Sequence, residues 1–102
     1  MKFEELGVVV NTVGVQSEFE KNDAFKDFVL NCLLVRYVNE DWGDLDAEDK
    51  ALNDAAVKNG DDRILASYRI PDDVGYDIDA EKIWIITEWD RSATTILFPS
   101  EY

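Results

Sequence analysis

Histidine is absent from this chain, and Cys32 is its only cysteine. A single thiol cannot form an internal disulfide, which is typical of proteins from a reducing compartment, so we expect a cytoplasmic location. One cysteine without histidine does not supply an ordinary set of zinc ligands. It also leaves the Cys32 thiol without the imidazole base that activates most catalytic cysteines. We therefore interpret Cys32 as a buried, inert side chain on an apolar helix face.

Basic residues are scarce as well, because 10 Lys and Arg stand against 23 Asp and Glu, a net charge of −13. Such an excess repels nucleic acids and anionic membranes and attracts basic surfaces. We expect a protein partner with a basic surface, and neither direct nucleic-acid binding nor membrane association. The longest nearly apolar stretch, residues 28–38, is interrupted by Asn31 and Arg36 and is too short to span a bilayer.

Motifs for phosphate or dinucleotide binding are missing too. The chain has five glycines, and their spacing fits neither a phosphate loop nor a dinucleotide-binding turn. The sequence therefore predicts no cofactor and does not point to an enzyme.

The pattern of apolar residues predicts a single α+β domain over residues 1–102. Three C-terminal strands, at 63–70, 82–89 and 94–98, follow one another and predict an antiparallel meander. Two main helices, at 23–39 and 46–59, are expected to pack on one face of the sheet. The β-branched run between Gly7 and Gly14 predicts a short, well-buried N-terminal strand. The connection at 71–81 is polar and rich in turn residues.

The segment 23–39 is apolar around most of a helical surface. Such a helix is either enclosed in the core or shared with a partner, and a homodimer through this helix is one expectation. The piece "CLLVRYV" at 32–38 is also compatible with a strand.

Residues 40–50, "EDWGDLDAEDK", contain six acids. The spacing does not fit an EF-hand, because counting from Asp41 or from Asp44 puts neither glycine at the sixth position nor glutamate at the twelfth. Asp46 is a natural N-cap, and acids in the first turn favour the positive end of a helix dipole. We interpret the acids mainly as the start of a helix, and a looser Mg²⁺ or Ca²⁺ site from Asp44, Asp46 and Asp49 is the alternative.

The acids continue to residue 62, and together they predict an acidic face that binds a basic partner. Its candidate residues are Asp41, Asp44, Asp46, Glu48, Asp49, Asp61 and Asp62.

A second candidate surface is the hairpin tip within "TEWDRSATT" (87–95), through Glu88, Trp89, Asp90 and Arg91. The structural interpretation is a turn in which Asp90 and Ser92 satisfy backbone N–H groups while Arg91 pairs with a nearby acid. The functional alternatives are a protein contact, or a polar ligand-binding or acid–base site.

About half of the chain resembles a family of small bacterial proteins encoded on plasmids, phages and integrated elements, often labelled "plasmid-related protein". A tryptophan–glycine pair precedes a capped helix, and Trp-Ile-Ile-Thr-Glu, Asp-Arg-Ser and a terminal Pro-x-x-Tyr follow. The matching positions are Trp42, Gly43, Asn53, Arg63, Trp84 to Glu88, Asp90 to Ser92, Thr94, Thr95, Pro99 and Tyr102. The family has no established chemistry, but its setting implies binding to proteins of host defence or of element maintenance.

Three functions remain open on the sequence. The first is non-enzymatic inhibition of a nucleic-acid-targeting defence enzyme (anti-CRISPR or anti-restriction), with the acidic face as a DNA mimic. The second is a regulatory, structural or immunity-type binding protein of the element. The third is a small ligand-binding domain or enzyme that uses the hairpin tip.

Overall fold

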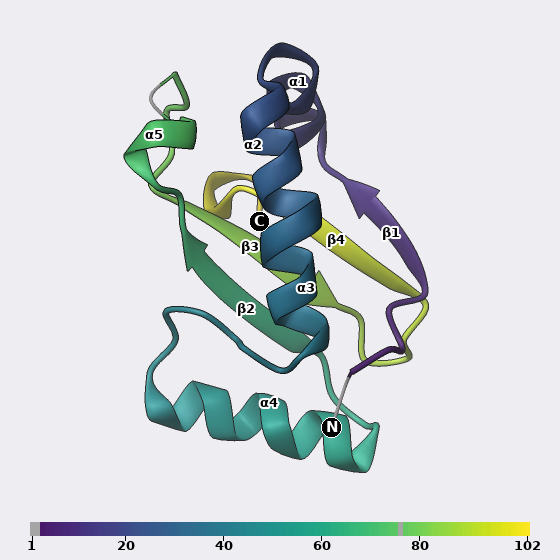
Figure 1. Cartoon of the computed structure of the whole chain (residues 1–102). Helices are drawn as coiled ribbons and strands as arrows, with labels where there is room; N and C mark the ends of the chain where they lie inside the picture. Colours follow the sequence, from purple (N-terminus) through teal and green to yellow (C-terminus); the bar gives the residue numbers. More distant parts are fainter. Residues whose placement is uncertain (1–2, 76) are drawn as a thin grey trace.

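The computed structural model describes residues 3–75 and 77–102. Four strands form one mixed sheet in the order β1-β4-β3-β2, and a long helix crosses one face of it (Figure 1). The α+β class is confirmed. In the described part of the chain, no helix has the length and apolar character needed to span a membrane.

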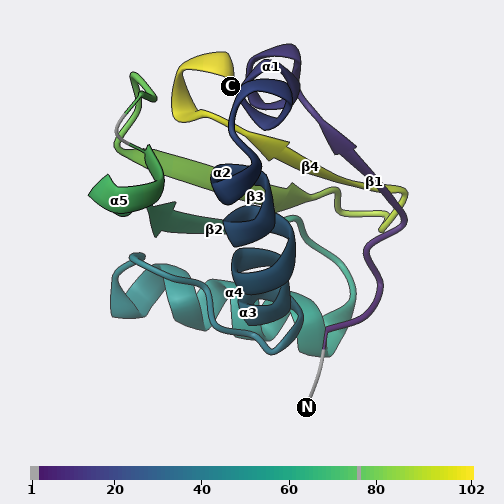
Figure 2. The same ribbon diagram turned by 45° about the horizontal axis from the view of Figure 1, so that its top comes forward.

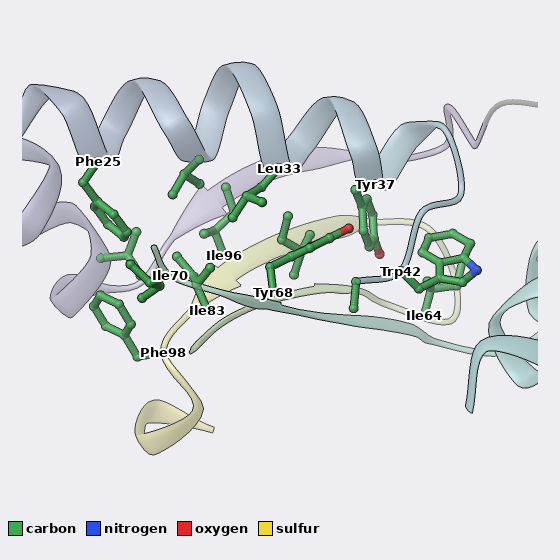
Figure 3. Close-up of a cluster of buried hydrophobic side chains, with 14 of the residues drawn as sticks. Phe25, Leu33, Tyr37, Trp42, Ile64, Tyr68, Ile70, Ile83, Ile96 and Phe98 are labelled. Carbon is green, nitrogen blue, oxygen red and sulfur yellow. The ribbon is translucent and has the colours of Figure 1, made fainter. Parts of the chain in front are cut away.

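The predicted antiparallel meander is present. It consists of β2 (Ile64–Arg69), β3 (Lys82–Thr87) and β4 (Ala93–Leu97). Alternate side chains of each strand are buried beneath the long helix, and Tyr68, Ile83 and Ile96 are among them (Figure 3). This period of two is what a strand with one covered face requires.

The N-terminal strand differs from the prediction. β1 (Val8–Asn11) is present, but all four of its residues are exposed. It pairs parallel to β4, with Val8 opposite Ala93, and so forms an edge of the sheet. The β-branched run is therefore an exposed edge strand and not the buried strand that the sequence predicts.

The segment expected at 23–39 is helical from residue 23 to residue 38, so the stretch 32–38 is helix and not strand. α1 (Val13–Lys21) comes first, and α2 (Asp23–Phe28), η1 (Val29–Leu33) and α3 (Leu34–Val38) then form one continuous helix (Figure 2). Cys32 is exposed on this helix, so its predicted burial is wrong.

The buried residues of the long helix are spaced by four: Phe25, Val29, Leu33 and Tyr37. In a regular α-helix this spacing drifts around the axis by about 40° per repeat. The π-helical turn at 29–33, where the Leu34 N–H donates to the carbonyl of Val29, widens the helix and counters the drift. All four side chains therefore face the sheet, as the labelled Phe25, Leu33 and Tyr37 show in Figure 3.

A chain of hydroxyls crosses the core below α3. The Thr94 hydroxyl donates to the Leu6 carbonyl, so Thr87 donates to Thr94 and Tyr37 donates to Thr87, each with an oxygen separation of 2.7 Å. Burial raises the pKa of the Tyr37 phenol well above its ordinary value. The hydrogen bonds offset the cost of burying these three hydroxyls, and they fasten the segment at residue 6 to the sheet.

The second predicted helix, α4 (Ala47–Asn59), begins and ends as expected. The Asp46 carboxylate accepts a hydrogen bond from the Asp49 N–H (2.8 Å), and Gly60 ends the helix at a φ of 68°. α4 borders the outer edge of β2 (Figure 1), because the Asn53 amide donates to the Leu65 carbonyl (2.8 Å) and accepts from the Leu65 N–H (3.3 Å). One side chain thus takes the place of a neighbouring strand.

The rest of that edge is closed by residues 42–44. The Ser67 N–H donates to the Trp42 carbonyl (3.3 Å), the Ser67 carbonyl accepts from the Asp44 N–H (2.7 Å), and the Arg69 N–H donates to the Asp44 carboxylate (2.7 Å). The close approach needs glycine at 43, where φ is 80° and a Cβ atom would overlap the Ser67 carbonyl.

The remaining segments are short. The connection at 71–81 contains α5 (Asp72–Gly75), and the chain ends with η2 (Pro99–Glu101). The Glu101 carboxylate accepts hydrogen bonds from the Thr12 hydroxyl (2.6 Å) and the Gly14 N–H (3.0 Å), which ties the C-terminus to the start of α1. Although burial acts in the opposite direction, these hydrogen bonds lower the pKa of Glu101.

We predict that Asn53→Ala lowers the free energy of unfolding by about 1–3 kcal/mol, because it leaves the Leu65 N–H and carbonyl without their partner. Asn59→Ala is the matched control, since Asn59 is an exposed asparagine in the same helix, and should change it by less than about 0.5 kcal/mol. Urea denaturation measures both. Equal unfolding midpoints for the two variants would contradict the proposed closure of the β2 edge.

Candidate functional site

Acidic side chains are concentrated around the two ends of α4. Asp44, Asp46, Glu48 and Asp49 lie at its N-terminal end, and Asp61 and Asp62 follow its C-terminal end. We call these six residues the acidic surface, and all six are exposed. A helix of 13 residues is about 20 Å long, so the two groups of charge are separated by roughly that length.

Two of the six acids also hold the local structure together. Asp46 caps α4, and Asp44 closes the β2 edge through the Arg69 N–H. The capping interpretation of the acidic stretch is therefore confirmed. Within residues 3–75 and 77–102, no three His, Cys, Asp or Glu residues are arranged to hold a metal ion.

Asp41, the seventh predicted member of the acidic face, belongs to the scaffold. Its carboxylate pairs with the Arg36 guanidinium (2.8 Å) and accepts from the Gly43 N–H (3.2 Å), while its carbonyl accepts from the Tyr68 hydroxyl (2.7 Å). The hydrogen bond from Arg36 is the main cause that lowers the pKa of Asp41. The charge of Asp41 is partly compensated, so it contributes less to the acidic surface than the other six.

Glu48, Asp49 and Asp61 are the exposed acids best placed to meet a partner, because their side chains close no structural contact described above. Asp62 accepts from the N–H of its neighbour Arg63 (2.8 Å) but is also exposed. Lys50 and Lys58 are the two bases on α4. The three acids of α4 itself are nearly balanced by these lysines, so the excess of acids comes mainly from the residues that flank the helix.

The hydrogen-bond partners of Arg91 differ from the prediction. Its side chain binds backbone carbonyls and not the carboxylate of a nearby acid. Its guanidinium donates to the carbonyls of Ala56 in α4 (2.8 Å), Asp62 (2.5 Å) and Glu88 (3.3 Å). It also lies over the Phe3 ring, 5.6 Å from the ring centroid. A cation near the last turn of a helix is favourable for the helix dipole. Arg91 thus fastens the hairpin tip to the C-terminal end of α4.

The other hairpin residues lie at the surface. Glu88, Trp89 and Asp90 are exposed, and 64% of Trp89 is accessible to solvent. The Asp90 carboxylate accepts from the Ser92 N–H (3.0 Å), as the turn interpretation predicts, and contact with Ser92 lowers the pKa of Asp90. An exposed tryptophan thus lies on the hairpin tip that Arg91 fastens to Asp62.

The two surfaces predicted separately from the sequence are therefore neighbours. Sequence reasoning missed this connection, because Ala56 and Arg91 are 35 residues apart and no local pattern links them. The sequence signal is the arginine itself, at the tip of a predicted hairpin, and its positive φ of 61° emerges only in the structure.

We predict that Arg91→Lys lowers the free energy of unfolding by about 1–3 kcal/mol, because lysine keeps the charge but cannot reach several carbonyls with a planar fork. Arg69→Lys is the matched control, since the Arg69 side chain is exposed on β2. Thermal unfolding should separate them by about 4–8 °C per kcal/mol. If the two variants melt together, the anchoring role of Arg91 is wrong.

Comparison with protein-family models, with curated proteins and with solved structures finds no match to this chain.

Proposed function

We propose that this protein is a non-enzymatic binding protein whose acidic surface occupies a basic, nucleic-acid-binding groove on a protein target. The target class that fits the charge and the mobile-element resemblance is a defence enzyme that acts on nucleic acids, such as a CRISPR or restriction complex. The observation that carries the proposal is the array of exposed acids at both ends of α4, a helix docked on the sheet edge through Asn53 and Arg91.

The charge density of this surface supports mimicry of a nucleic-acid backbone. Each strand of duplex DNA carries one phosphate per about 3.4 Å of axis, so about 20 Å of one strand carries about six charges. The six carboxylates of the acidic surface give a similar total charge over a helix of that length, in two groups at its ends with Lys50 and Lys58 between them. A groove that accepts a phosphate backbone therefore meets a similar number of negative charges.

The alternative of a ligand-binding or acid–base site at the hairpin tip is less well supported. Arg91 is engaged with backbone carbonyls, and Asp90 accepts from the backbone of Ser92. Thr94, which belongs to the same cluster in the sequence, is buried and donates to the Leu6 carbonyl. The hydrogen bonds of these side chains stabilise the fold, which favours a non-catalytic role for the hairpin tip.

A second candidate is an immunity-type or regulatory partner of a basic protein of the same element. Trp89 favours it, since an exposed aromatic beside acids is the kind of anchor that protein interfaces use. Both candidates use the same surface, and the identity of the captured partner separates them.

We predict that the target binds in a strongly salt-dependent manner, because the attraction is between exposed charges. The test is affinity capture from a host lysate treated with nuclease, with elution by a salt series and, separately, by duplex DNA. The expected partner is a nucleic-acid-binding protein that either eluent releases. A partner that resists both would contradict mimicry.

A charge-matched pair of variants makes the test specific to the surface. The first variant neutralises four exposed acids around α4: Glu48→Gln, Asp49→Asn, Asp61→Asn and Asp62→Asn. The control makes the same change in net charge at four exposed acids of the 71–81 connection: Asp72→Asn, Asp73→Asn, Asp77→Asn and Asp79→Asn. We expect the first to weaken capture mainly through a slower association rate, by at least about tenfold, and the control to have little effect. Equal loss in both would mean that net charge alone, and not this surface, drives binding.

A further inference from the structure

The two edge strands of the sheet, β2 and β1, differ in whether their outward backbone groups have hydrogen-bond partners. On β2 the outward N–H groups of Leu65, Ser67 and Arg69 all have partners from Asn53 and residues 42–44. On β1 the N–H groups of Val8 and Thr12 donate inward to the carbonyls of Ser92 and Ile96 in the β4 region. Because successive residues of a strand point their backbone groups in opposite directions, the backbone groups of Val9 and Asn11 face outward. Figure 1 shows no element beyond β1 on that side.

The side chains of this open edge are apolar and exposed. Val8, Val9 and Val10 are 65%, 40% and 41% accessible. An exposed edge strand of β-branched residues is a template for pairing with another strand, and proteins usually protect such an edge with lysine, proline or a covering segment. Residues 6–17 contain no lysine or proline, and each residue of Val8–Asn11 is exposed.

The distribution of charge favours a second copy of this chain as the partner of the β1 edge. The two longest stretches of the chain without a charged residue are 6–17 and 92–100, and they contain β1 and its neighbour β4. In a chain with a net charge of −13, two copies repel each other over most of their surface. The β1 edge is the place where two copies approach with the least repulsion. A strongly basic partner would instead be drawn to the acidic surface.

We propose that a second copy of this chain pairs with the β1 edge, antiparallel, to form a continuous eight-stranded sheet about a two-fold axis. With Val9 opposite its own copy, Val8 of each copy lies opposite Val10 of the other. All three valines then make cross-strand apolar pairs, and the outward N–H and carbonyl of Val9 gain partners. Because β1 has four residues, the pairing is small, and association depends on concentration.

The arrangement has a consequence for function. The strand order places β2, and with it α4, at the far end of each half-sheet. The two β2 strands then lie about 34 Å apart, at a spacing of about 4.8 Å per strand, and the dimer presents one acidic surface beyond each of them. Dimerisation also has the opposite salt dependence from partner binding, because added salt screens the repulsion between two acidic copies.

Sedimentation velocity over a range of protein and salt concentrations tests the proposal. We expect a monomer–dimer equilibrium that salt strengthens, with a dissociation constant that Val9→Lys raises by at least about tenfold. Val13→Lys is the matched control, since it adds the same charge at a position 87% accessible in α1, outside the strand, and should leave the equilibrium nearly unchanged.

Cross-linking provides a second readout that does not depend on a destabilising charge. In a Cys32→Ser background, Val9→Cys should give a disulfide-linked dimer on mild oxidation, because antiparallel partners have Cα atoms about 5.5 Å apart. Val13→Cys should not. A monomer at every concentration would overturn the proposal. So would a dimer that Val9→Lys leaves intact and Val35→Lys removes, which would place the interface on the half-exposed Val35 of the long helix.

Discussion

The outer edge of β2 is the constraint on which the rest of this structure depends. The N–H and carbonyl groups of Leu65 and Ser67 and the N–H of Arg69 would otherwise lie unpaired at the side of a buried strand, and an unpaired polar group there is costly. Residues 42–44 pair with Ser67 and Arg69, and the Asn53 amide pairs with both backbone groups of Leu65. This closure also brings the Trp42 indole against α4, where it donates to the Asp54 carboxylate (2.9 Å). α4 has only two buried residues of its own, so its position is set mainly by these polar contacts.

The acidic surface follows from that closure. Acids that begin and follow α4 point into solvent because the helix uses Asn53 and Ala56 to face the sheet. Arg91 fixes the C-terminal end of α4 from the hairpin, so the spacing between the two acidic groups is that of a helix held at both ends. An array of fixed charges attracts a complementary groove at less entropic cost than the same acids on a flexible segment. The open β1 edge is the counterpart of the closed one, and it carries no charge.

Sequence reasoning reached the elements whose signals are local. The cap at Asp46 and the strand signals of β2 and β3 each depend on a few adjacent residues. It failed where contacts between residues distant in the sequence determine the burial or the partners of a side chain. The valines of β1 look like a buried strand, yet their place at a sheet edge is set by pairing with β4. The exposure of Cys32 depends on a π-helical turn, and the partners of Arg91 lie in α4 and the following loop. The acids of the candidate site could be predicted from the composition, but their proximity to the hairpin tip could not.

Amide hydrogen exchange at Leu65, Ser67 and Arg69 tests the central claim most directly. If Asn53 and residues 42–44 close the β2 edge, these three amides exchange as slowly as the interior amides of β3, and only through global unfolding. Exchange at the rate of exposed loop amides, while β3 and β4 remain protected, would contradict the account. In that case α4 would not be held against the sheet, and the acids at its two ends would not form a fixed surface.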